Sequence, residues 1–141
     1  MNDANKVVVC RFYEECLNRH NPAIYTEFYS EVVYRASAIG ELRGEAHRQF
    51  LVTLFRGFPD AHWTIKDQVA AEDKVATRWA FAGTHNGMFK GIPATGRHLH
   101  YSGISMARLA GGKIVEEWEE WDTLGVLHQL GAIGPANGLA K

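Results

Sequence analysis

Apolar residues in the first part of the chain recur with the spacing of helices. From a cap at Asn2 or Asp3 to about Leu17, they fall three or four residues apart and so share one helical face. Asn21 followed by Pro22 predicts a second helical start, with asparagine as the cap and proline in the first turn. We therefore expect two consecutive helical segments here.

A short strand and a third helix are expected next. Residues 32–37 predict the strand, which carries Arg35. Glu45–Phe55 predicts a helix, because its apolar residues again follow the helical period, and Gly57 and Pro59 end it.

The pattern then changes to the two-residue alternation that is typical of strands. Four strands joined mostly by tight turns are predicted, over His62–Ala71, Lys74–Ala82, His98–Leu109 and Lys113–Asp122. The segment 83–97, GTHNGMFKGIPATGR, carries four glycines and one proline and is long for a hairpin connection. We expect it to be a functional lid or a structured rim. After Asp122 the pattern turns helical.

Helices followed by an antiparallel meander predict an α+β fold, with the N-terminal helices packed on the concave side of a cone-shaped curved sheet. Such a cone leaves an apolar mouth, lined by strand side chains, where a small ligand binds. One domain is expected over residues 1–141, with a core at about 4–131 and a flexible tail at 132–141.

Charge and cysteine usage narrow the expected partners. The 15 Lys and Arg nearly cancel the 16 Asp and Glu, and no basic stripe occurs, so nucleic acid is not expected to bind. The first residues lack the pattern of a signal peptide, and no stretch approaches the roughly 18 apolar residues of a membrane span. Cys10 and Cys16 lie too far apart on a helix for a disulfide, so we expect reduced thiols and a cytoplasmic protein.

The richest candidate chemistry lies on the last predicted strand, KIVEEWEEWD. Side chains alternate between the two faces of a strand, so Trp118, Glu120 and Asp122 share one side, and Glu117 and Trp121 share the other. A carboxylate at the end of an aromatic-rich strand is a candidate acid or base, because partial burial raises its pKa. The alternative is an edge strand whose acidic side chains face water.

Other candidates come from the remaining elements. His98 and His100 form a His-x-His pair, but no third metal ligand follows at a diagnostic spacing, so we expect no metal and assign His100 an acid/base or hydrogen-bonding role. His85 stands where a strand enters the long loop, and Arg35 can anchor a carboxylate or an ester carbonyl. Solvent exposure is the alternative for both.

Tyr13 and Trp79 lie on faces predicted to point inward, where each either contacts a ligand or belongs to the core. No GxSxG, GxxxxGK[ST] or GxGxxG motif occurs, so acyl-serine chemistry, nucleotide binding and dinucleotide binding have no support.

Three segments together resemble one family. They are FYEECLNRHNP, FPDAHWTIKDQVAAEDKVATRWAFAGTHNGMFKGIPATGR and GGKIVEEWEEWDTLGVLHQLG, and they are similar to the SnoaL-like polyketide cyclases of the nuclear-transport-factor-2-like superfamily. The resemblance implies an α+β cone, an apolar pocket, no cofactor, and a homodimer or higher homo-oligomer. It also implies that Asp122, which precedes the LG-x-L segment, is the general acid/base. The chain departs from many relatives at two places. It has Tyr34-Arg35 where they carry Asp-His or Asn-His, and it has Glu117 where they carry a histidine.

These observations favour a cofactor-independent enzyme that performs an intramolecular aldol condensation on a polycyclic aromatic polyketide ester. In this hypothesis Asp122 moves the proton, and Trp118 and Glu120 raise its pKa. Two alternatives stay open: a non-catalytic domain that binds a small apolar or aromatic molecule, and a lyase or isomerase, such as a hydratase, that uses the same pocket.

Overall fold

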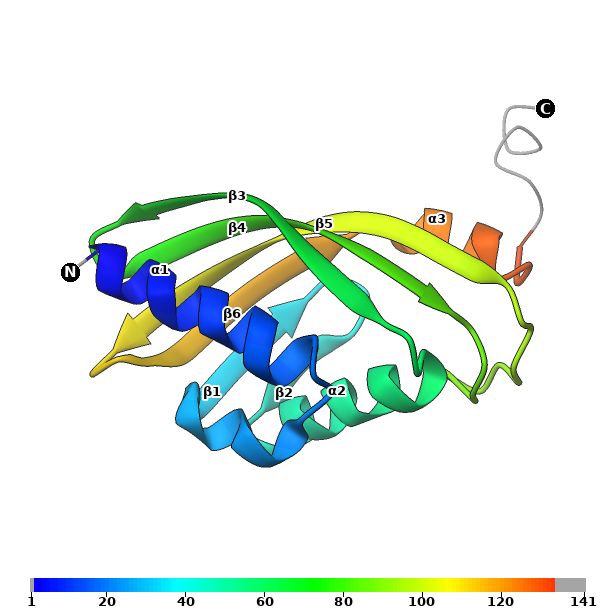
Figure 1. The fold of residues 1–141 in the computed structure, drawn as a ribbon, viewed down its shortest axis with the longest axis horizontal. Coiled ribbons are helices and arrows are strands. Elements are labelled where there is room, and N and C mark those ends of the chain that lie inside the picture. Colours follow the sequence, from blue (N-terminus) through cyan, green and yellow to red (C-terminus); the bar gives the residue numbers. More distant parts are fainter. Residues whose placement is uncertain (1, 134–141) are drawn as a thin grey trace.

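Six strands form one curved, unclosed sheet, and the helices of the first half of the chain lie on one side of it (Figure 1). The computed structural model describes residues 2–133, so most of the expected tail, 134–141, lies outside the described residues. The elements are α1 (Asn2–Arg11), a π-helical segment η1 (Phe12–Leu17), a 3₁₀ segment η2 (Pro22–Glu27), β1 (Tyr29–Ala36), β2 (Gly40–Arg43), α2 (Glu45–Gly57), β3 (His62–Ala71), β4 (Lys74–Thr84), β5 (His98–Ala110), β6 (Lys113–Trp121) and α3 (Thr123–Gln129).

The α+β class and the helices on the concave side of the sheet are confirmed. The strands run in the order β2-β1-β6-β5-β4-β3, and the meander from β3 to β6 is antiparallel throughout, as expected. The predicted cap at Asn21 is also confirmed, because its side chain accepts a hydrogen bond from the Ala23 N–H and Pro22 occupies the first turn of η2.

Two features of the sheet differ from the expectation. β1 runs parallel to β6, so the sheet is mixed rather than fully antiparallel. β2, the tetrapeptide GELR, was not expected; it pairs antiparallel with β1 as a short and mostly exposed strand. A sequence this short and polar lacks an apolar alternation to reveal it. No helix among residues 2–133 is long and apolar enough to cross a membrane.

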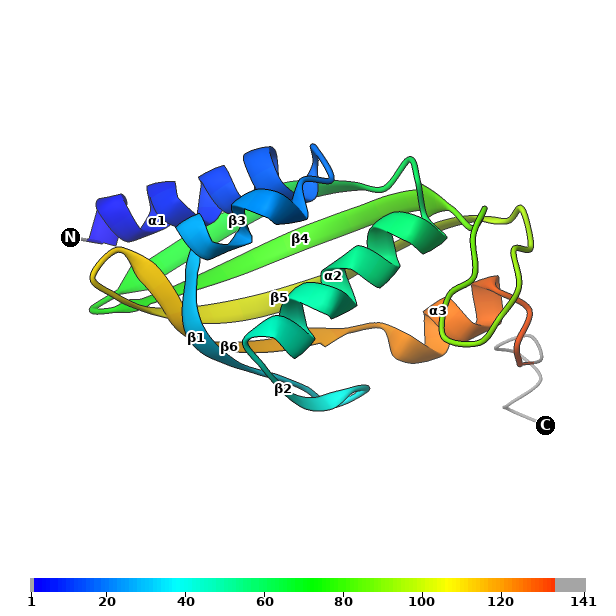
Figure 2. The same cartoon turned by 90° about the horizontal axis from the view of Figure 1, so that it is seen from below.

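The loop between β4 and β5, residues 85–97, is docked on the end of α2 as a structured rim. The backbone N–H groups of Asn86 and Gly87 donate to the Gly57 carbonyl at 3.0 and 3.1 Å. Gly87 permits this approach, because a Cβ there would lie 2.1 Å from the Arg56 carbonyl oxygen. Figure 2 shows the loop lying between the end of α2 and α3.

Candidate functional site

An aromatic cavity of about 310 Å³ lies between the helices and the concave face of the sheet. Its residues come from η1, β1, α2, β3, β4, β5, β6, α3 and the rim loop. The size is at the lower end of the range for small-molecule sites, which are apolar clefts with a few polar groups.

Aromatic rings form much of the cavity wall. Phe50 and Trp121 stack with their ring centroids 6.3 Å apart, and Trp79 meets Tyr101 edge to face at 5.9 Å. Gly103, opposite Trp79 in the sheet, leaves the room for that indole, because a Cβ there would lie 2.4 Å from it. Such walls favour a flat, largely apolar molecule.

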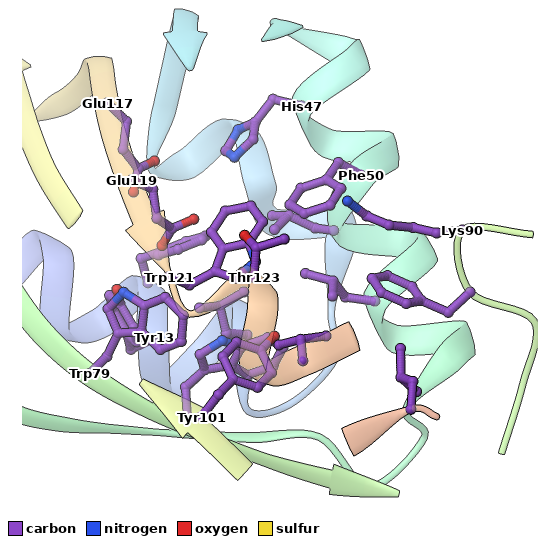
Figure 3. Close-up of a pocket in the computed structure, with 18 of the residues that line it drawn as sticks. Tyr13, His47, Phe50, Trp79, Lys90, Tyr101, Glu117, Glu119, Trp121 and Thr123 are labelled. Carbon is purple, nitrogen blue, oxygen red and sulfur yellow. The ribbon is translucent and has the colours of Figure 1, made fainter. Parts of the chain in front are cut away.

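Two carboxylates, Glu117 and Glu119, face this cavity from β6 (Figure 3). The alternation of β6 places them on the inner face together with Trp121. Glu117 is only 6% exposed, and acidic residues are almost never buried so fully without a partner.

Each carboxylate accepts one short hydrogen bond from a tyrosine. The Tyr29 hydroxyl donates to Glu117 Oε1 at 2.7 Å, and the Tyr34 hydroxyl donates to Glu119 Oε1 at 2.7 Å. For the second oxygen of each carboxylate, no hydrogen bond of standard geometry is found among residues 2–133, although the Trp79 N–H lies near Glu119. These oxygens are therefore available to a bound molecule.

Burial raises the pKa of both carboxyl groups well above the ordinary value of 4.5. Repulsion by Glu119 raises the pKa of Glu117 further, and the Tyr29 bond only partly offsets this. At Glu119 the Tyr34 hydroxyl favours the charged form. The nearby Trp79 N–H also favours the charged form of Glu119. Within the described part of the chain, this N–H makes no hydrogen bond of standard geometry. The pair therefore shares its protons near neutral pH.

His47, on α2, is a further polar group of the cavity and is 2% exposed. Its Nδ1 lies 2.7 Å from the Tyr25 hydroxyl, and its ring stacks on Tyr34 at 4.3 Å. Burial lowers the pKa of His47 to about 3, so the imidazole is neutral and supports the two tyrosines rather than adding charge.

Of the residues singled out in the sequence, Tyr13 and Trp79 line the cavity. Tyr13 is buried and its hydroxyl lies 3.3 Å from Ser105 Oγ. Trp79 presents its indole N–H near Glu119.

The other residues predicted on β6 lie outside the cavity. Asp122 is exposed and caps α3, its Oδ1 accepting a hydrogen bond from the Gly125 N–H at 2.9 Å. Glu120 points to the outer face and accepts bonds from the Ser37 N–H and hydroxyl. Trp118 lies on that face too, with the Arg35 guanidinium 5.6 Å from its ring. The proposed effect of Trp118 and Glu120 on Asp122 therefore has no support from this arrangement.

Arg35, His100 and His85 also lie away from the cavity. Arg35 forms an ion pair with Glu116 at 2.9 Å. His100 is exposed on β5 and lies beside His98. It points away from the cavity, whereas the next residue, Tyr101, points into it. His85 is buried and holds the rim loop, with Nδ1 2.9 Å from the Thr95 hydroxyl. The roles given to these residues stay untested predictions.

Sequence reasoning did not select Glu117, Glu119, His47 or Lys90, all of which line the cavity. The alternation of β6 did separate Glu117 and Glu119 from Glu120, but it does not say which face is concave. No group of three or more His, Cys, Asp or Glu side chains among residues 2–133 could hold a metal ion.

A family model described as SnoaL-like polyketide cyclase matches residues 7–130. The chain belongs to this family. No curated protein matches the sequence.

Solved structures show the same fold. IdmH of Streptomyces antibioticus, a proposed polyketide cyclase, is 28% identical with a TM-score of 0.79, over 90% of this chain and 98% of that one. A proposed SnoaL-like polyketide cyclase of Jannaschia sp. CCS1 is 21% identical with a TM-score of 0.86, over 94% and 95%. AclR of Streptomyces galilaeus, a proposed hydroxylase, is 24% identical with a TM-score of 0.85, over 95% and 100%.

Proposed function

We propose that this protein is a cofactor-independent, polyketide cyclase-like enzyme that uses Glu119 and Glu117 as its acid/base pair. Its substrate is a flat polyketide-type molecule with an acidic carbon between carbonyl groups, and its reaction is an intramolecular aldol addition. The observation that carries the proposal is the pair of buried carboxylates facing an aromatic cavity in a member of the SnoaL-like family.

The pair can supply both proton transfers. The ionised carboxylate removes a proton from the carbon between the carbonyls, leaving a carbanion that the substrate's own carbonyls delocalise. That carbon then bonds to a second carbonyl carbon of the same molecule, and the resulting alkoxide takes a proton from the protonated carboxyl. A raised pKa matches both tasks, since general acid–base groups work best when their pKa lies near the operating pH.

Glu119 is the better candidate for contact with the reacting atoms. It is the less buried of the pair, and it lies nearer to Trp121 than Glu117 does (Figure 3). Asp122 is less suited, because its carboxylate is exposed and caps α3. The Trp79 N–H is buried near Glu119, where it favours the ionised form of that carboxylate.

A substrate panel tests this function. Polycyclic aromatic β-dicarbonyl compounds, as acids and as methyl esters, are incubated with the protein, with steroids as controls, and products are analysed by mass and by NMR. An aldol addition leaves the mass unchanged and creates a new carbinol carbon, hydration adds one water, and a binding domain shifts the melting temperature without forming product. Binding without turnover by every β-dicarbonyl at every pH would overturn the enzymatic proposal.

The assembly proposed is a homodimer through the outer face of the sheet. Ile104 and Met106 are large apolar side chains on that face of β5, 55% and 41% exposed. A second copy covering them would remove this apolar area from water. Sedimentation that gives a monomer at micromolar concentration would reject it.

The free thiols of Cys10 and Cys16 are consistent with the reducing cytoplasm, which we propose as the site of action.

A further inference from the structure

Lys90 is the only Lys or Arg among the described residues that line the cavity. It stands on the rim loop, and its amine points from the mouth toward Phe50 and Trp121 (Figure 3). No carboxylate of residues 2–133 lies within 4 Å of this amine.

The surroundings of the amine are aromatic rather than acidic. Its Nζ lies 5.9 Å from the centre of the Phe89 ring and 6.0 Å from that of Trp121. Although the residue as a whole is exposed, burial of the amine lowers the pKa of Lys90, and no charged group in the described part of the chain opposes this effect. Two ring faces compensate a partly desolvated cation only in part, so the site favours an anion.

The turn that carries Lys90 is tight and uncommon for this residue type. Phe89 and Ile92 exchange two backbone hydrogen bonds, at 3.0 and 2.8 Å, around a two-residue turn. Lys90 has a φ of +50° and Gly91 a φ of +75°, a combination that favours asparagine or glycine at the first position. A strained non-glycine residue held at a cavity mouth is a feature of functional sites.

The turn is also anchored. Phe89 is buried and packs edge to face on Phe58, with ring centroids 5.2 Å apart. The backbone that carries Lys90 is therefore fixed, so ion pairing has to order only the lysine side chain and not the loop.

We propose that Lys90 forms an anion-binding subsite at the cavity mouth and that the natural ligand is a free carboxylic acid. This inference rests on the proposed function and specifies its substrate class: the carboxylate pairs with the Lys90 amine, and the apolar rings extend inward toward Glu119. An ester, which the family resemblance led us to expect, lacks the charge that this subsite takes.

The test compares one acid with its own methyl ester. Anthraquinone-2-carboxylate and methyl anthraquinone-2-carboxylate are titrated by calorimetry at one pH into the full-length protein. The variants are Lys90→Asn, which suits the positive φ, Lys90→Arg, which keeps the charge, and Lys66→Asn as a control on the exposed part of β3. Thermal melts check the fold of each variant.

The wild type and Lys66→Asn are expected to bind the acid about tenfold more tightly than the ester, the scale of a partly buried charged hydrogen bond. Lys90→Asn should lose this preference while keeping its affinity for the ester, and Lys90→Arg should retain it. In the wild type, raising the salt concentration should weaken binding of the acid but not binding of the ester.

A preference for the acid that survives in Lys90→Asn, or equal affinity of the wild type for acid and ester, would overturn the subsite and leave the proposed function standing. Absence of binding by both ligands would instead overturn the polycyclic ligand class, and the subsite with it. Should Lys90→Asn fail to fold, Lys90→Gly and the salt dependence of the wild type decide the same question.

Discussion

Replacing Glu117 by glutamine should stabilise the protein at neutral and alkaline pH. In the folded state the pKa of Glu117 is raised, by burial and by repulsion from Glu119. Below the ordinary carboxyl pKa of 4.5, Glu117 is protonated in both the folded and the unfolded chain, so its ionisation does not lower the free energy of unfolding. As the pH rises above that value, the unfolded chain ionises first, so the free energy of unfolding falls until the folded pKa is passed.

The size of this effect follows from the shift. Each pKa unit corresponds to about 1.4 kcal/mol. Glutamine cannot ionise, and its amide oxygen can still accept the Tyr29 hydrogen bond that now ends on Glu117 Oε1. After allowing for burial of the amide, we expect Glu117→Gln to gain about 2 kcal/mol at pH 8, or about 5 °C in Tm for a chain of this size, and almost nothing at pH 4.

Urea unfolding followed by circular dichroism between pH 4 and pH 9 measures this difference. Glu120→Gln is the matched control, because Glu120 lies on the same strand but points to the outer face, where it binds Ser37. Its stability should stay close to that of the wild type across the whole range, because repulsion by Glu120 is only the smallest contribution to the raised pKa of Glu119. If the stability of Glu117→Gln also follows that of the wild type, or is lower at pH 8, the claim that the buried Glu117 carboxyl group destabilises the fold is refuted.

Three further outcomes are expected. Asp122→Ala should lose the cap of α3 and about 1 kcal/mol of stability in thermal melts, but keep its kcat/KM. A hundredfold loss of kcat/KM would show that Asp122 takes part in the reaction. Tyr34→Phe removes the hydroxyl that favours ionised Glu119, so the acid limb of the kcat/KM profile should move up by about one pH unit; an unmoved limb would contradict this. Phe89→Ala should cost about 3 kcal/mol in urea unfolding and weaken binding of the acid at Lys90, and undiminished acid binding would show that the loop needs no anchor.

The strands of the meander could be predicted closely from the sequence, because each long alternating segment carries enough apolar residues to define its face. The prediction for His62–Ala71 agrees with the structure at both ends. Pairing between distant segments could not be predicted: nothing in the pattern of β1 indicates that it runs parallel to β6, since both strands alternate in the same way. β2 was missed because four mostly exposed residues bury too little to leave a pattern.

The site shows the same limit. Alternation placed Glu117 on one face of β6 and Glu120 on the other, but which face is concave depends on the helices that cover it. The end of the strand at Trp121 turned Asp122 into a helix cap, a role that Asp fills often. Lys90 gave no signal either, because its position depends on a two-residue turn within a loop that folds against α2.

The measurement that tests the central claim most directly is kcat/KM of Glu119→Gln on a substrate that the panel identifies, beside Glu120→Gln and Asp122→Asn. The proposed mechanism predicts a loss of about 10² to 10⁴ for Glu119→Gln, the scale of a general acid–base group, and a change below about threefold for the other two. Full activity in Glu119→Gln, with the loss appearing in Asp122→Asn instead, would contradict the assignment of the buried pair and place the chemistry at the end of the strand.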